Sequence, residues 1–291
     1  MKIISLVLMF LLFFTGCSNN TVVEEKDTFN IVTSFYPVYV FTKNITKDIP
    51  DVKITNMSND HSGCLHDYHL TTTDMKLIAD ADAFIINGAG LETFLEKAYS
   101  VQDDLEVIDS SEGINLLSER FSDEDNEHIW LSISNSIEQV KNIGENLARL
   151  DKEHESLYLT NTYEYVTRLE TLRNELRESM YQNVDVKMVT SHDAFPYFAD
   201  DFGFDVVSVI EKEEGTSPTS REMQEIIKII KENEVKAIFI EKDSSTKIAD
   251  TIAAESGAKV YGLDTITSGD GDFTDYEDRM RENINVIKES L

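Results

Sequence analysis

Two kinds of hydrophobic pattern alternate along most of the chain. Short apolar runs of strand length are followed by runs in which apolar residues recur at helical spacing. The predicted strands are 31–34, 52–57, 83–87 and 106–109 in the first half, and 186–190, 205–210, 235–240 and 259–263 in the second. The predicted helices are 74–80, 91–99, 194–202, 221–233 and 246–256, with a terminal helix from about residue 275. This alternation predicts an α/β protein in which each half carries a mostly parallel sheet.

A long helix is predicted between the two halves. Residues 151–184 contain neither Gly nor Pro. Their large apolar side chains recur at spacings of three and four, as one face of a helix requires: Tyr165, Leu169, Leu172, Leu176 and Met180. We therefore expect this helix to join a first lobe at 28–150 to a second lobe at 185–291, and to flex less than a loop connection would.

The N-terminus has the pattern of a secretion signal. An apolar run begins after Lys2 and ends at Phe14, and it is shorter than the roughly 20 apolar residues that a membrane-spanning helix needs. A Thr-Gly pair then precedes Cys17, which resembles a lipoprotein-processing box, although Phe14 stands where Leu is usual. We expect a signal peptide at 1–16, a lipidated Cys17 and a polar linker at 17–27, which would anchor the protein on the extracytoplasmic face of the cell membrane. The alternative is an ordinary secretory signal with a chance Cys.

The chain is strongly acidic, with 55 acidic residues, 26 basic residues and a formal net charge of −29. Such a charge repels nucleic acid and enriches cations near the surface, so nucleic acid is not expected as a partner. Acidity also keeps an exported protein soluble, and by itself it does not identify a cation site. Only two cysteines are present, and lipidation of Cys17 leaves Cys64 as a single thiol. A disulfide framework is therefore excluded, and Cys64 is either a small buried residue or a metal ligand.

An acidic run at 270–275 has a superficial likeness to a calcium-binding loop. The position that requires Gly in such a loop is Asp275 here, and the position that requires Glu is Arg281. We expect a solvated turn before the terminal helix.

The candidate chemistry lies in the histidines, which are His61, His66, His69, His128, His154 and His192. His192 and Asp264 each follow a predicted strand by one or two residues, and open α/β sheets bind ligands at the carboxyl ends of their strands. His66 and His128 lie in polar connecting segments of the first half, whereas His154 is expected at the solvated start of the long helix. Because a lone His is more often structural than a ligand, position alone leaves both interpretations open, and the roles of the other histidines stay unassigned.

Six short motifs occur in the order seen in the zinc and manganese solute-binding proteins of ABC importers. They are Ser34-Phe35-Tyr36-Pro37, His66-Asp67-Tyr68, Asn87-Gly88-Ala89-Gly90-Leu91-Glu92, His128-Ile129-Trp130-Leu131, Ser191-His192-Asp193-Ala194-Phe195 and Leu263-Asp264. The similarity covers essentially the whole mature chain. Together with the lipoprotein box and the long helix, these motifs give the chain a specific resemblance to that family.

The resemblance implies two similar α/β lobes, each a mostly parallel four-stranded sheet with flanking helices, joined by one long rigid helix with metal in the interlobe cleft. The family's ligand positions fall on His66, His128, His192 and Asp264 of this sequence. A monomer that delivers its metal to the ABC permease and ATPase of an importer is also implied. The sequence lacks the Pro residues usual near the first two ligands, which puts the conformation of those loops in question. It also lacks the His-rich loop of many zinc members.

Three imidazoles and one carboxylate suit Zn²⁺ in tetrahedral geometry. Mn²⁺ is the alternative, but manganese members of the family tend to carry a carboxylate at the position of His192, and nitrogen there favours zinc. Magnesium and calcium prefer oxygen ligands, so they are poor candidates.

Two functions of other classes compete with a transport role. A zinc hydrolase also uses three histidines around an open position, but Asp264 would fill that position, and the sequence contains no nucleophile motif or His-Glu-x-x-His helix. A surface adhesin with a structural metal is the second alternative. We expect a metal-delivering binding protein rather than an enzyme.

Overall fold

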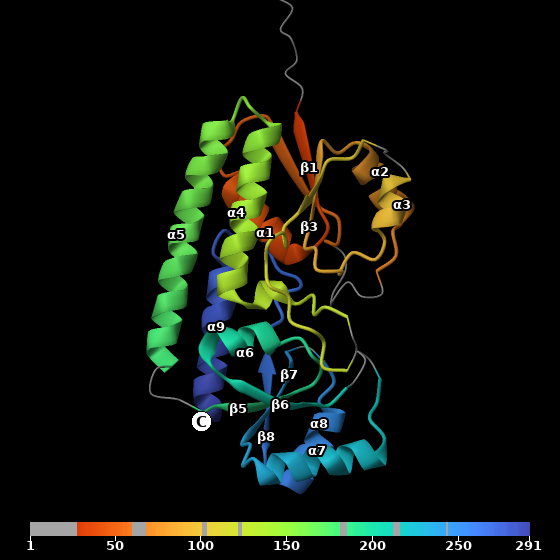
Figure 1. Ribbon diagram of the computed structural model, residues 1–291, viewed down its shortest axis with the longest axis vertical. Coiled ribbons are helices and arrows are strands. Elements are labelled where there is room, and N and C mark those ends of the chain that lie inside the picture. The colour runs from red at the N-terminus through yellow and green to blue at the C-terminus, as the bar shows by residue number, and fades with distance from the viewer. Residues whose placement is uncertain are drawn as a thin grey trace, which may run out of the picture.

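The computed structural model describes residues 28–59, 68–100, 104–121, 124–180, 185–211, 216–242 and 244–291. These residues form two four-stranded parallel sheets with flanking helices, one sheet in each half of the chain (Figure 1). The predicted fold class is therefore confirmed. Within the described ranges, no helix is both long and apolar enough to cross a membrane.

The first sheet has the strand order β2-β1-β3-β4. Its elements are β1 (Phe29–Thr33), α1 (Tyr36–Ile45), β2 (Val52–Asn56), α2 (Thr72–Ala79), β3 (Ala83–Ile86), α3 (Leu95–Tyr99) and β4 (Val107–Asp109). Strand β3 is buried along its whole length, as expected for a central parallel strand. Pro37 lies in the first turn of α1, where its fixed φ suits the helix and where its missing amide hydrogen would have had no acceptor within the helix. The helix predicted at 91–99 begins only at Leu95.

The second sheet has the equivalent order β6-β5-β7-β8. Its elements are β5 (Lys187–Thr190), α6 (Pro196–Phe202), β6 (Asp205–Val209), α7 (Ser220–Glu232), β7 (Ala237–Glu241), α8 (Lys247–Ser256), β8 (Lys259–Leu263) and α9 (Asp275–Ser290). Helix α7 begins with a capping box, in which Thr219 and Glu222 each accept from the other's backbone amide. These strands and helices lie within a few residues of the predicted ones.

The two sheets repeat the same hydrogen bonds at the end of their first strand. In the first sheet, the amide of Ser34 donates to the carbonyl oxygen of Ile85 at 2.9 Å. In the second sheet, the amide of Ser191 donates to the carbonyl oxygen of Phe239 at 2.8 Å. The chain therefore builds two equivalent sheets although no sequence repeat is evident, and in the second sheet this bond lies directly before His192.

Two long helices pack against each other beside the first sheet (Figure 1). They are α4 (Ile133–Leu150), which follows the short 3-10 turn Ile129–Leu131, and α5 (Glu155–Met180). Helix α5 is the helix predicted at 151–184, of which 181–184 lie outside the described residues, whereas α4 was missed. The two helices approach closely at Gly144, where a Cβ atom would lie 1.9 Å from the Thr162 hydroxyl oxygen.

One hydrophobic cluster is shared by the two halves. It contains Ile85 of the first sheet, Phe239 of the second, and buried residues of α1, α4, α5, α6 and α9. Helix α5 contributes Tyr165, Leu169, Leu172, Leu176 and Met180, the apolar face that the sequence predicted. The long helix therefore packs into a core common to both halves.

The acidic run at 270–275 is only partly solvated. Asp270 and Asp272 are exposed, as expected. However, Gly271 is buried and its carbonyl oxygen accepts from Lys43 Nζ on α1. Asn44 Nδ2 on the same helix donates to the carbonyl oxygen of Phe273 at 3.1 Å. This turn therefore attaches the second half of the chain to α1 of the first.

Candidate metal centre

Two of the predicted ligands, His128 and His192, face each other. His128 directly precedes the 3-10 turn in the first half, and His192 follows β5 in the second. Both are buried, and their Nε2 atoms lie 3.4 Å apart. Two nitrogens bound at 2.0–2.1 Å to one tetrahedral centre would be about 3.3–3.4 Å apart. The pair therefore already has the spacing of two zinc ligands.

The other ring nitrogen of each histidine contacts an oxygen acceptor. His192 Nδ1 lies 2.7 Å from Oε1 of Glu241, and His128 Nδ1 lies 3.2 Å from Oδ1 of Asn126. Because a carboxylate can only accept, the contact with Glu241 needs the proton on Nδ1 and directs the Nε2 lone pair toward the partner histidine. Oxygen partners of this kind orient metal-binding histidines.

Glu241 was not predicted as a site residue. It is the last residue of β7, at the same carboxyl edge of the sheet as His192. The sequence did offer one indication of its role: Glu241 comes directly after the apolar run 237–240, at the end of a strand whose other residues are buried.

The segment before His128 is fixed from both halves of the chain. Asn126 Nδ2 donates to the carbonyl oxygen of Asp193 at 2.7 Å, next to His192. Asn87 Nδ2 donates to the carbonyl oxygen of Glu127 at 3.0 Å. The ring of Trp130 lies 5.2 Å from the ring of His128, and its Nε1 donates to the carbonyl oxygen of Thr265 at 2.8 Å. These contacts fix the backbone around the histidine pair.

Glu92 organises the loop that carries Asn87. Its carboxylate accepts from Ser34 Oγ at 2.6 Å, from the Asn87 amide at 2.8 Å and from the Gly88 amide at 3.0 Å. Burial raises the pKa of Glu92 to about 7, although these three hydrogen bonds act in the opposite direction. Gly88 has a φ of +79°, and a Cβ atom there would lie 1.9 Å from Oδ1 of Asp109, so this loop requires glycine.

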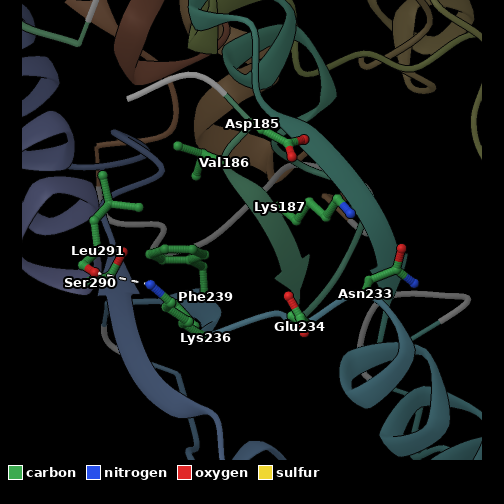
Figure 2. Close-up of a pocket in the computed structure, with 10 residues that line it drawn as sticks. Asp185, Val186, Lys187, Asn233, Glu234, Lys236, Phe239, Ser290 and Leu291 are labelled. Carbon is green, nitrogen blue, oxygen red and sulfur yellow. Dashed lines mark hydrogen bonds between the residues drawn. The ribbon is translucent and has the colours of Figure 1, made fainter. Parts of the chain in front are cut away.

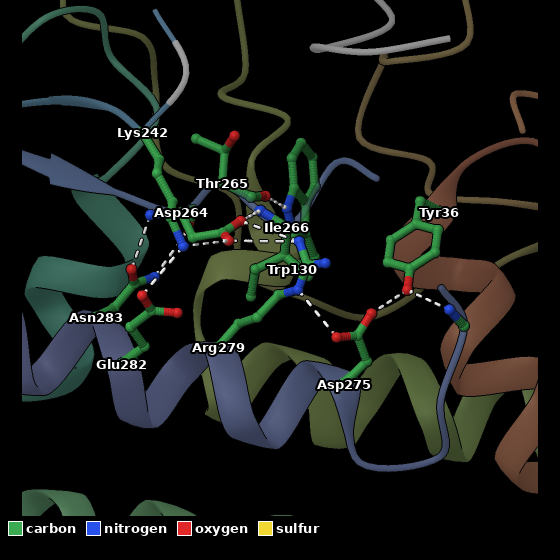
Figure 3. Close-up of polar contacts among 11 residues, drawn as sticks. Tyr36, Trp130, Lys242, Asp264, Thr265, Ile266, Asp275, Arg279, Glu282 and Asn283 are labelled. Atoms are coloured by element: carbon green, nitrogen blue, oxygen red, sulfur yellow. Dashed lines mark hydrogen bonds and ion pairs between the residues drawn. The ribbon is translucent and has the colours of Figure 1, made fainter. Parts of the chain in front are cut away.

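Asp264 directly follows β8, but a cation and a backbone amide occupy its carboxylate (Figure 3). Arg279 Nη1 lies 3.3 Å from Oδ1 and 3.4 Å from Oδ2, and the Ile266 amide donates to Oδ1 at 2.8 Å. Burial alone would lower the pKa of Arg279, but Asp264 and Asp275 outweigh it and raise that pKa. Among the residues that the structure describes, no three His, Cys, Asp or Glu side chains are grouped closely enough to hold a metal.

The remaining predicted residues have different outcomes. His66, His61, Cys64 and the lipidation site Cys17 lie outside the described residues. His69 is exposed. The solvated position predicted for His154 is wrong, because this residue is 7 % exposed and its Nδ1 lies 2.7 Å from Oδ2 of Asp151. Asp151 also accepts from Tyr158, so the three side chains close the turn between α4 and α5.

A concavity of about 200 Å³ lies at the opposite end of the second sheet (Figure 2). Its lining includes Lys187 and Ala237, the first residues of β5 and β7. Since ligands of open α/β sheets bind at the carboxyl ends of strands, this concavity is not part of the histidine site.

The chain is similar to known proteins along most of its length. Residues 31–290 match the protein family described as zinc-uptake complex component A, periplasmic. The chain is 30 % identical over 289 residues to the high-affinity zinc uptake system protein ZnuA of Bacillus subtilis, covering 92 % of this chain and 89 % of that protein. It is 25 % identical over 282 residues to the manganese-binding lipoprotein MntA of Halalkalibacterium halodurans, covering 95 % and 93 %.

The fold is also similar to that of solved structures. A crystal structure of ZnuA has a TM-score of 0.79 and 28 % sequence identity, with 91 % of this chain and 99 % of that chain covered. The family match covers residues 31–290, and the fold consists of two equivalent parallel sheets with a buried histidine from each half. The chain belongs to the ZnuA family of metal-binding proteins of ABC uptake systems.

Proposed function

We propose that this protein captures a zinc ion outside the cytoplasm and delivers it to an ABC importer. The observation that carries the proposal is the pair His128 and His192, whose Nε2 atoms lie 3.4 Å apart, the spacing of two ligands on one zinc ion. Their Nδ1 contacts to Asn126 and Glu241 orient both rings before metal arrives. ZnuA of Bacillus subtilis, the relative at 30 % identity, is named for zinc uptake.

The proposed ligand set is His66, His128, His192 and Asp264. In this proposal, the lobes 28–150 and 185–291 each supply two ligands, so neither lobe completes the coordination shell alone. Metal then favours the lobe arrangement in which all four ligands meet. The size of this preference is the difference between the affinity of the metal for that arrangement and its affinity for the other arrangements. For Asp264 to join the site, its carboxylate must exchange part of its contact with Arg279 for the metal.

Metal binding by the soluble chain from residue 18 onward tests this function. Protein purified without added metal is analysed for bound metal and titrated with zinc against a chromophoric chelator. We expect one zinc per chain in the wild type and loss of that site in a His128→Ala/His192→Ala double variant. His69→Ala, which removes an exposed histidine, is the matched control and should bind as the wild type does. No stoichiometric zinc, or zinc binding that survives the double variant, would contradict the proposal.

Zinc is proposed as the physiological metal rather than manganese. His192 contributes a nitrogen, and the Irving–Williams order places zinc above manganese for a given nitrogen and oxygen site. The relatives include both a zinc protein and a manganese protein, so they do not distinguish the two metals. The choice of zinc therefore rests on the nitrogen ligand. Competition between the two metals in the same titration tests it, and equal affinities would contradict it.

The proposed location is the outer face of the cell membrane, through lipid on Cys17. A related manganese-binding protein is named a lipoprotein, which supports this location. Cys17→Ala should then yield protein that is secreted or left uncleaved, and recovery of an acylated, membrane-bound form would contradict the anchor. Fractionation and mass spectrometry distinguish these products.

We further propose that the protein acts as a monomeric binding partner of a permease and its ATPase, and not as an enzyme. The zinc-loaded chain should stimulate ATP hydrolysis by the reconstituted importer, while turnover of ester or amide substrates should equal that of zinc alone. Turnover that depends on His128 would favour a hydrolase instead.

A further inference from the structure

The carboxylate of Asp264 lies between two cations. Arg279 Nη1 contacts both of its oxygens, at 3.3 and 3.4 Å, and Lys242 Nζ lies 4.0 Å from Oδ2 (Figure 3). The Asp264 side chain is 15 % exposed, so water screens these contacts only in part. The charge of the proposed oxygen ligand is thus largely neutralised within the protein.

Arg279 is held in this position by the element that carries it and by the first half of the chain. Its Nε donates to Oδ1 of Asp275, one turn earlier on α9, at 3.0 Å. The other oxygen of Asp275 accepts from the hydroxyl group of Tyr36 on α1, and the Arg279 guanidinium lies 5.9 Å from the Tyr36 ring centroid. Figure 3 shows these groups as one row from Tyr36 to Asp264.

Lys242 is held less firmly against Asp264. Its Nζ is 3.0 Å from Oε1 of Glu282, nearer than to Asp264, and its side chain is 47 % exposed. The Arg279 side chain is 22 % exposed. Arg279 is therefore the cation that an arriving metal ion would have to compete with for Asp264.

A metal ion and a guanidinium group attract the same lone pairs of a carboxylate. A fixed cation in contact with the ligand oxygens reduces the negative potential that a divalent ion meets there, and it repels the ion itself. The contact keeps the Asp264 carboxylate paired, and Arg279 would remain beside a bound ion as a neighbour that favours its departure. For a protein that must release its cargo, this competition is useful.

We propose that Arg279 is a positioning residue that holds the Asp264 carboxylate in the metal-free protein and weakens zinc binding by competing for it. This inference rests on the proposed function, since it takes zinc as the ligand and Asp264 as part of its site. Arg279 limits affinity and speeds release, while His128 and His192 supply the attachment.

Arg279→Gln removes the charge and tests the competition directly. We expect the zinc Kd of this variant to fall about tenfold or more, and zinc transfer to a chromophoric chelator to slow correspondingly in a stopped-flow measurement. Arg279→Lys keeps the charge and should stay close to the wild type. Arg279→Leu, which also lacks the charge, provides a second neutral variant if Arg279→Gln fails to fold.

Two controls separate local competition from a general change of charge. Arg281→Gln removes the same charge two residues further along α9, where Arg281 contacts Asp278 and Glu175, and it should leave zinc binding unchanged. In an Asp264→Asn background, Arg279→Gln should no longer tighten binding. Weaker or unchanged binding in the neutral variants would overturn the inference, as would equal tightening by Arg281→Gln or in the Asp264→Asn background.

The failure of this inference can be distinguished from the failure of the proposed function. If the wild type binds zinc through His128 and His192 but the neutral Arg279 variants bind no more tightly, only the role of Arg279 is wrong. If the wild type binds no zinc at all, the proposed function fails and the role of Arg279 fails with it.

Discussion

Neutralising Glu92 is expected to change how the stability of the protein depends on pH. Burial raises the pKa of this carboxyl group from its ordinary value of 4.5 to about 7 in the folded protein. A group whose folded-state pKa is raised contributes stability that is fully present below its unfolded pKa and is lost as pH rises through the folded pKa. Glu92 should therefore favour the folded state most below pH 4.5 and least above pH 7.

The size of the effect follows from the shift. A tenfold change in an acid dissociation constant corresponds to about 1.4 kcal/mol, so raising the pKa of Glu92 from 4.5 to about 7 corresponds to roughly 3 kcal/mol over the whole titration. Between pH 5 and pH 8 the expected loss is roughly 2–3 kcal/mol, because part of the titration lies below pH 5. The three hydrogen bonds that Glu92 accepts remain available to the ionised form and are already included in the shifted pKa.

Urea unfolding of chelator-treated protein at pH 5, 6, 7 and 8 measures this contribution. The free energy of unfolding of the wild type minus that of Glu92→Gln should fall by roughly 2–3 kcal/mol from pH 5 to pH 8. Subtracting the free energy of the variant cancels the contributions of other titrating groups. As a control, Glu138→Gln, at an exposed position on α4, should show no such trend. A difference that stays constant within about 1 kcal/mol, or that rises with pH, would refute a raised pKa at Glu92.

Four further outcomes are expected. Glu241→Gln should weaken zinc binding about 10- to 100-fold in a chelator competition, because the amide no longer fixes the proton on Nδ1 of His192; unchanged affinity would remove Glu241 from the site. Gly144→Ala should lower the free energy of unfolding by about 1–3 kcal/mol in urea, since its Cβ would meet the Thr162 hydroxyl, and Thr162→Ala should restore part of the loss. A thousandfold excess of zinc over Kd should stabilise the protein by about 4.1 kcal/mol and raise the Tm, whereas an identical melting curve of verified metal-free protein would contradict a native-state site. His192→Glu should narrow the preference for zinc over manganese, and a wild type that binds both metals equally would disprove nitrogen-based selectivity.

The sequence predicted the parallel sheets because strand and helix periodicities differ, and buried parallel strands such as 83–86 form apolar runs. It also predicted that His192 and Asp264 follow strands, since a carboxyl-end position can be counted along the chain. Helix α4 was missed because it lies directly after a long polar segment that shows no periodicity, although its own apolar residues are buried.

Contacts between distant residues could not be predicted in this way. Glu241 lies 49 positions from His192, and only the parallel pairing of β5 with β7 brings them to one edge. Arg279 lies on a helix whose exposed charges give no indication of which one contacts Asp264. His154 was misjudged for another reason: its place near the start of a helix suggested exposure, whereas Asp151, three residues before it, and Tyr158, four residues after it, pack around its ring.

The hydrophobic cluster shared by the two halves sets the free-energy cost of moving them apart. Separating the halves as hinged jaws would expose apolar side chains such as those of Phe239 and Leu169 to water. At about 25 cal/mol per Å², exposing roughly 300 Å² costs about 7 kcal/mol, within the range of the total stability of an ordinary domain. A partner that removes the metal is therefore expected to act without separating the two halves, because that separation would cost about as much free energy as keeps an ordinary domain folded.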